Sequence, residues 1–146
     1  GVSALNMAQN TPKTTKIVTL EKFDEFKNIA QKNFRDNHFE KKIKILLGDA
    51  NNTLLKLKKK KFDLVFIDGD KGNYLSIFKL IEKNNIKKNS IIIVDNYFFH
   101  GDVVNKKPRT EKGKGVKALI NYIEKNDNFT KTILPIYDGI LLLKKK

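Results

Sequence analysis

The sequence predicts an α/β fold, a mostly parallel doubly wound sheet that ends in an antiparallel hairpin. Strand-like and helix-like segments alternate along the 146 residues, which is the pattern of a parallel sheet with crossover helices. The apolar run Ser90–Val94 is typical of a strand in the buried centre of such a sheet. Near the end of the chain, two apolar runs flank Asp138-Gly139, and this favours a hairpin. The length predicts a single domain over residues 1–146.

Each element follows from the spacing of apolar residues, which is two in half-buried strands and three to four in helices. The expected strands are Lys16–Leu20, Lys42–Leu47, Phe62–Ile67, Ser90–Val94, Phe129–Leu134 and Ile140–Leu143. The expected helices are Glu21–Asn37, Asn52–Lys59, Tyr74–Asn84 and Val116–Lys125. The first of these helices has apolar side chains at helical spacing, namely Phe23, Phe26, Ile29, Ala30 and Phe34.

The composition excludes several classes of protein. Without cysteine the chain has no disulfide framework, no thiolate metal site and no cysteine nucleophile. The longest apolar runs, Ile91–Val94 and Ile140–Leu143, are far short of the roughly 20 residues that span a bilayer. No signal-peptide pattern opens the chain. We therefore expect a cytoplasmic protein without membrane contact.

The charge is strongly positive, with 30 Lys and Arg against 16 Asp and Glu, a net charge of +14. Such a charge can reflect nucleic-acid binding. However, nearly all of it is lysine, with arginine only at Arg35 and Arg109, whereas specific nucleic-acid binders commonly use the bidentate fork of arginine. General composition is therefore the favoured interpretation, and RNA stays open as a partner.

Acidic and amide residues follow the predicted parallel strands at their carboxyl ends, where open α/β sheets bind ligands. These residues are Glu21, Asp49, Asp68, Asp95 and Asn96. Glu21 can accept hydrogen bonds from both ribose hydroxyls of a nucleoside cofactor, or simply favour a helix N-terminus. Asp49 can cap the next helix or border an adenine.

Asp68, Asp95 and Asn96 indicate a specific kind of site more clearly than Glu21 and Asp49 do. Two carboxylates and an amide oxygen are hard ligands suited to Mg²⁺ or Ca²⁺, and their strands bring them together if the strands are neighbours. Separate helix capping by each residue is the alternative, and we favour the metal. Lys71 can act as a general base in such a site, or be a solvated lysine. His100 is expected in a loop over the site, either touching substrate or metal or, as we favour, as a half-buried loop histidine.

Six motifs occur in an order and spacing that resemble the cation-dependent O-methyltransferases, the catechol and caffeoyl-coenzyme A type. They are Gly1-Val2-Ser3-Ala4, Ile17-Val18-Thr19-Leu20-Glu21, Leu47-Gly48-Asp49-Ala50, Phe62-Asp63-Leu64-Val65-Phe66-Ile67-Asp68-Gly69-Asp70-Lys71, Val94-Asp95-Asn96 and Tyr137-Asp138-Gly139. The match covers the whole chain. Asp70 stands where animal catechol enzymes have an aromatic residue, so the sequence resembles the bacterial branch.

The resemblance implies a Rossmann-like class I methyltransferase sheet, S-adenosylmethionine as methyl donor and Mg²⁺ or another divalent cation. The resemblance implies that the donor is bound by Gly1, Ser3, Glu21, Asp49, Ala50 and Asp68. It implies Asp68, Asp95 and Asn96 as metal ligands. Lys71 would take the proton of the acceptor hydroxyl. We expect a small catechol-like acceptor, with a tRNA hydroxyuridine as the alternative.

The start of the chain departs from the family pattern. Members of the family have N-terminal helices, a first central strand and a glycine-rich turn before the residue that matches Gly1, and this chain has none of them. We therefore expect a sheet without its first central strand. We also expect the full-length protein to be a homodimer. A truncated, non-catalytic binding domain is a further alternative.

Overall fold

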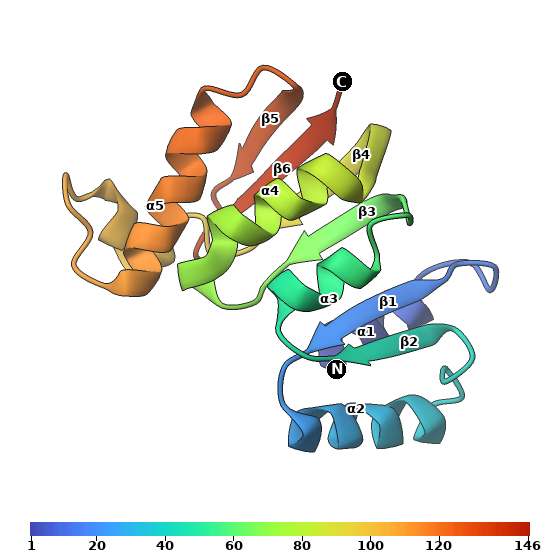
Figure 1. Ribbon diagram of the computed structural model, residues 1–146. Helices are drawn as coiled ribbons and strands as arrows, with labels where there is room; N and C mark the ends of the chain where they lie inside the picture. Colours follow the sequence, from blue (N-terminus) through green and yellow to red (C-terminus); the bar gives the residue numbers. More distant parts are fainter. The chain divides into compact units, whose positions relative to one another are not determined.

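The computed structural model describes all 146 residues, which form two compact units, Gly1–Lys56 and Leu57–Lys146 (Figure 1). Their six strands form two sheets, one of order β1-β2 and one of order β3-β4-β6-β5. This agrees with the expectation of a sheet without its first central strand. None of the helices has the length and hydropathy of a membrane span.

The first unit is a two-stranded parallel sheet with helices. Its elements are α1 (Val2–Gln9), β1 (Ile17–Glu21), α2 (Asp24–Asp36), β2 (Ile43–Leu47) and α3 (Ala50–Lys56). The pairing runs from Ile17 opposite Ile43 to Glu21 opposite Leu47. A small core holds the unit together, and its buried residues are Ala4, Ala8, Ala30, Phe34 and Ile43.

Helix α1 was not predicted from the sequence. It fully buries only the small residues Ala4 and Ala8, whereas its larger apolar residues Val2, Leu5 and Met7 are exposed or half-buried, so the apolar pattern of a helix is weak here. The segment also packs closely at its start: a Cβ on Gly1 would lie 2.7 Å from the Cβ of Ala30 and 3.0 Å from the Phe34 ring. Carbon atoms attract best at about 3.5–4.0 Å, so a Cβ at this position would overlap its neighbours and glycine fits best.

The second unit carries a mixed four-stranded sheet. Its elements are β3 (Phe62–Ile67), η1 (Lys71–Asn73), α4 (Tyr74–Asn84), β4 (Ile86–Val94), η2 (Phe99–Val104), α5 (Glu111–Glu124), β5 (Phe129–Leu134) and β6 (Ile140–Lys145). Strands β3 and β4 are parallel, whereas β6 runs antiparallel to both β4 and β5. The predicted C-terminal hairpin is confirmed.

Helices α4 and α5 cover one face of this sheet. The Phe78 ring of α4 lies 6.0 Å from Tyr122 of α5 and 5.6 Å from Phe129 of β5, between ring centroids. Ile92 is fully buried on the covered face, but Ile91 is 41% exposed. The prediction that Ser90–Val94 is buried on both faces was therefore wrong, because the helices of this unit cover only one.

Several predicted boundaries were wrong because backbone hydrogen bonding and capping override apolar spacing. Helix α2 begins at Asp24, since Glu21 completes the β1 ladder opposite Leu47. Helix α3 spans Ala50–Lys56 rather than Asn52–Lys59. Helix α5 spans Glu111–Glu124 rather than Val116–Lys125, because the Thr110 hydroxyl caps it by accepting from the Gly113 N–H. Strand β4 begins at Ile86, four residues before the predicted start.

The predicted apolar stripe of α2 is only partly buried. Ala30 and Phe34 belong to the core, but Phe23, Phe26 and Ile29 are 55%, 53% and 52% exposed. The rings of Phe23 and Phe26 pack edge to face on each other, with their centroids 5.9 Å apart. Helical spacing identified the helix correctly but overestimated the width of its buried face.

Candidate active site

The carboxyl ends of β1 and β2 form one rim of the first unit. The Gly48 N–H donates to the Glu21 carbonyl over 2.8 Å, and Gly48 has a φ of 129°, which glycine tolerates best. The N-terminus lies beside the arrowheads of these strands (Figure 1), so Gly1 and the first turn of α1, with Ser3, stand at the same end. The residues predicted to contact the donor from this unit therefore share one end of its sheet.

The Glu21 carboxylate has a fixed orientation. Its Oε1 accepts a hydrogen bond from the Phe23 N–H over 3.0 Å, and the residue is half-buried. This contact holds the side chain at the strand end, where the ribose role was predicted. It also gives the carboxylate a local structural contact, the alternative that the sequence left open.

Asp49 caps helix α3. Its Oδ1 accepts from the Asn51 N–H over 3.0 Å, and its carbonyl accepts from the Thr53 N–H and hydroxyl. Lys22 lies 3.7 Å from Oδ2. Of the two interpretations of Asp49, capping is present in the structure, and Ala50 follows as the first helical residue. A border to adenine stays a prediction for both residues.

In the second unit, Asp68 and Asp95 follow neighbouring parallel strands. Ile67 is opposite Val94, and the Asp95 N–H donates to the Ile67 carbonyl over 3.1 Å. The two aspartates thus leave the sheet side by side, as the prediction of a shared site requires. Asp95 is half-buried and Asp68 is exposed.

Tyr74 is buried beneath this pair. Its hydroxyl lies 3.4 Å from the Ile67 carbonyl and 3.3 Å from the Asp95 carbonyl. Burial, together with the Asp68 and Asp95 carboxylates, raises the pKa of the Tyr74 phenol, which therefore stays protonated and donates. The sequence predicted Tyr74 at the start of a helix but did not indicate that its hydroxyl would contact the ends of β3 and β4.

Lys71 lies against both Asp68 and Tyr74. Its Nζ is 2.9 Å from Asp68 Oδ1 and 5.5 Å from the centroid of the Tyr74 ring. The side chain is only 16% exposed, so Lys71 is not a freely solvated lysine. The amine is held beside the carboxylates, as a general base there would have to be.

Gly115 of α5 sets the position of the Lys71 segment. A Cβ on Gly115 would lie 2.7 Å from the Gly72 Cα and overlap the Lys71 carbonyl oxygen. The helix therefore approaches η1 so closely that only glycine fits. This residue was missed by sequence analysis, which began the helix at Val116.

Asn96 turns away from β4 in a left-handed conformation, with a φ of 56°. Its N–H donates to Asp95 Oδ1 over 2.8 Å, and its side-chain Nδ2 donates to Asp138 Oδ2 over 3.0 Å. The amide oxygen thus points away from Asp138. His100 lies in the following loop, within η2, and is exposed, so the prediction of a half-buried histidine was wrong.

That loop is anchored before α5 by Asp102. The carboxylate accepts hydrogen bonds from the Arg109 N–H, over 2.8 Å, and from the N–H and hydroxyl of Thr110. The Arg109 N–H above all holds the pKa of Asp102 down to about 2, since hydrogen bonds to a carboxylate favour its charged form. Asp102 therefore stays ionised and fixes the path from η2 to α5.

The donor set at the ends of β3 and β4 fits a hard divalent cation. No three or more His, Cys, Asp or Glu side chains group as a metal site, but the predicted set consists of two carboxylates and one amide. Asp95 keeps one oxygen beyond the one that the Asn96 N–H occupies, and Asn96 keeps its amide oxygen. Oxygen donors of this kind are typical ligands of Mg²⁺.

Comparison with solved structures defines the class of fold. An O-methyltransferase from Bacillus cereus, solved in complex with SAH, superposes with a TM-score of 0.93 at 25% identity, covering 100% of this chain and 70% of that one. The fold is thus the Rossmann-like fold of the class I methyltransferases.

The chain belongs to the O-methyltransferase family, whose model matches residues 1–146. It is 30% identical to "Probable caffeoyl-CoA O-methyltransferase 3" of Dictyostelium discoideum, covering 100% of this chain and 65% of that protein. It is 27% identical to a catechol O-methyltransferase of Niastella koreensis, covering 97% of this chain and 67% of that protein. The chain thus spans slightly less than two thirds of the length of the Dictyostelium relative.

Proposed function

We propose that the protein transfers a methyl group from S-adenosylmethionine to a hydroxyl of a small catechol-like acceptor and that it requires a divalent cation. One observation carries the proposal: Asp68 and Asp95 leave neighbouring strands side by side, and Asn96 follows Asp95 with its amide nitrogen, rather than its oxygen, bound to Asp138. Family membership supports the methyl transfer. The names of the relatives, caffeoyl-CoA and catechol O-methyltransferases, support the acceptor class.

In this proposal Asp68, Asp95 and Asn96 hold the cation, which when bound lowers the pKa of the acceptor hydroxyl. Lys71 Nζ lies beside Asp68; as the neutral amine it would take the hydroxyl proton and become the ammonium that pairs with this carboxylate. The sulfonium of the donor is intrinsically activated, so the protein mainly orients the two reactants. Asp68 also borders the donor.

The remaining donor contacts come from the first unit. The proposed residues are Gly1, Ser3, Glu21, Asp49 and Ala50. Glu21 binds the ribose, and the hydrogen bond from the Phe23 N–H, which already holds its carboxylate at the strand end, supports this role. We further propose that both units belong to one methyltransferase domain, in a cytoplasmic protein that is a homodimer at full length.

Replacing the ribose carboxylate is expected to weaken donor binding. Glu21→Ala removes charged hydrogen bonds of roughly 1.5–3 kcal/mol each, so the affinity of the full-length protein for S-adenosylhomocysteine falls at least about tenfold. Calorimetry measures this directly. Glu25→Ala, on the exposed surface of α2, is the control and leaves the affinity unchanged. Equal affinities for both variants would remove the ribose role.

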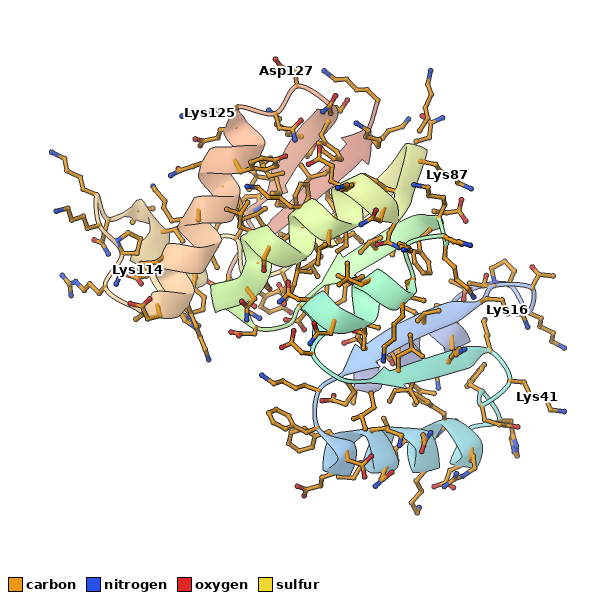
Figure 2. All side chains as sticks on the ribbon, viewed as in Figure 1. Lys16, Lys41, Lys87, Lys114, Lys125 and Asp127 are labelled. Carbon is orange, nitrogen blue, oxygen red and sulfur yellow. The ribbon has the colours of Figure 1, made fainter.

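A tRNA hydroxyuridine is the second candidate acceptor, and the charge of +14 favours it. Lysines at Lys58–Lys61 and Lys144–Lys146 are largely exposed, and Figure 2 shows Lys87, Lys114 and Lys125 at the surface of the second unit. If RNA is the acceptor, the logarithm of the tRNA association constant falls linearly and steeply with the logarithm of salt concentration, by about one unit of slope per neutralised phosphate. Weak binding without such a slope favours the small acceptor.

A further inference from the structure

The carboxylate of Asp138 joins two loops at the edge of the candidate site. Asp138 lies in the turn between β5 and β6, whereas Asn96 and His100 follow β4. Its Oδ2 accepts from Asn96 Nδ2 over 3.0 Å, and its Oδ1 accepts from the His100 N–H over 2.7 Å. Both oxygens of one half-buried carboxylate are thus engaged by the same loop.

The backbone around Asp138 is strained on both sides of this contact. Non-glycine residues with positive φ occur on either loop, namely Asn96 (56°), Phe99 (42°), His100 (53°) and Tyr137 (48°). Such conformations cost free energy and persist where surrounding contacts hold them, commonly at functional sites. Main-chain hydrogen bonds from Tyr97 to Gly139 and from Phe98 to Asp138, each 2.9 Å, add to the junction.

The chemistry of the contact decides which way the Asn96 amide faces. An ionised carboxylate only accepts hydrogen bonds, so the Asn96 NH₂ group must face Asp138 and its oxygen must face the other way. We propose that Asp138 is a positioning residue: it holds the Asn96 amide with its oxygen available as a metal ligand. This inference rests on the proposed function and extends it to a residue that does not touch the cation.

Without Asp138 the Asn96 amide is free to turn by 180°. In one of the two orientations the NH₂ group then occupies the position of the ligand oxygen, where it repels a cation. Residues that orient metal ligands from behind commonly contribute 10- to 100-fold to metal affinity. We therefore expect Asp138→Ala to weaken Mn²⁺ binding by about 10- to 100-fold. Asp138→Asn weakens it less, because an amide can still accept a hydrogen bond.

The test titrates the full-length protein with Mn²⁺ alone, followed by electron paramagnetic resonance. Asn96→Ala reports the loss of the ligand itself. Asp127→Asn is the matched control, an exposed aspartate before β5 that Figure 2 shows at the surface, and it leaves the affinity unchanged. The exchange Asn96→Asp with Asp138→Asn restores binding relative to Asp138→Asn, because residue 138 can then donate to a carboxylate with two equivalent oxygens.

A second measurement covers variants that fold poorly and the case in which Mn²⁺ does not bind. The side-chain amide resonances of Asn96, in a nitrogen–proton correlation spectrum without metal, should shift in Asp138→Asn but not in Asp127→Asn. Unchanged resonances, or loss of Mn²⁺ affinity in Asn96→Ala with full affinity in both Asp138 variants, would overturn the positioning role. Failure of the parent to bind Mn²⁺, with shifted Asn96 resonances, would overturn the metal requirement of the proposed function and leave the orientation of Asn96 by Asp138 standing.

Discussion

Methyl transfer by the full-length protein is expected to stop when a chelator removes divalent cations and to return on addition of Mg²⁺ or Mn²⁺. The expectation follows from the adjacent ends of β3 and β4, which Asp68 and the pair Asp95 and Asn96 directly follow. Unless a cation neutralises them, Asp68 and Asp95 would repel an acceptor whose hydroxyl is losing its proton. Turnover is measured with a catechol as the acceptor. Full activity in excess chelator would contradict the assignment of all three ligands.

The same expectation separates metal from donor binding. Asp95→Ala removes a charged ligand of a hard cation, so it lowers Mn²⁺ affinity far more than affinity for S-adenosylhomocysteine. The control is Asp63→Ala, an exposed aspartate of β3 whose carboxylate pairs with Lys87. Equal losses of metal and donor affinity in Asp95→Ala would indicate a folding defect and count against the ligand role.

The parts of the fold that the sequence predicted are those with large apolar side chains in regular spacing. The predicted bounds of Tyr74–Asn84, Phe62–Ile67 and Phe129–Leu134 coincide with α4, β3 and β5. Helix α1 was missed because alanines and the close approach at Gly1 hold it. In such a segment the contacts are decided by the partner surface, and the local pattern carries little of that information.

The site was predictable where it depends on topology. Parallel neighbouring strands end at the same edge, so residues that follow β3 and β4 had to lie close together, as Asp68 and Asp95 do. Residues that act through tertiary contacts were not predictable in their roles. Asp138 reaches Asn96 across 42 positions of sequence, and Gly115 matters only because η1 packs against it.

Replacement of Lys71 by methionine is expected to slow methyl transfer with little change in donor or metal affinity. The amine lies 2.9 Å from Asp68, within reach of an acceptor held at the ends of β3 and β4. General-base catalysis typically contributes about 10²- to 10⁴-fold, and part of this is masked when a cation already acidifies the hydroxyl. Methionine keeps an apolar stem of similar length and removes only the amine, with its contact to the Tyr74 ring, so packing loss is small.

Single-turnover rates across pH distinguish this role from a structural one. If Lys71 receives the proton, Lys71→Met is slower than the parent where the acceptor hydroxyl is protonated, and its rate recovers as that hydroxyl ionises with rising pH. Lys83→Met, an exposed lysine of α4, provides the control and keeps the parent profile. Since Lys71 also neutralises Asp68, the metal affinity of the variant must be measured alongside. A parent-like rate and profile in Lys71→Met would leave the amine only its ion pair with Asp68, and the acidified hydroxyl would then lose its proton directly to solvent.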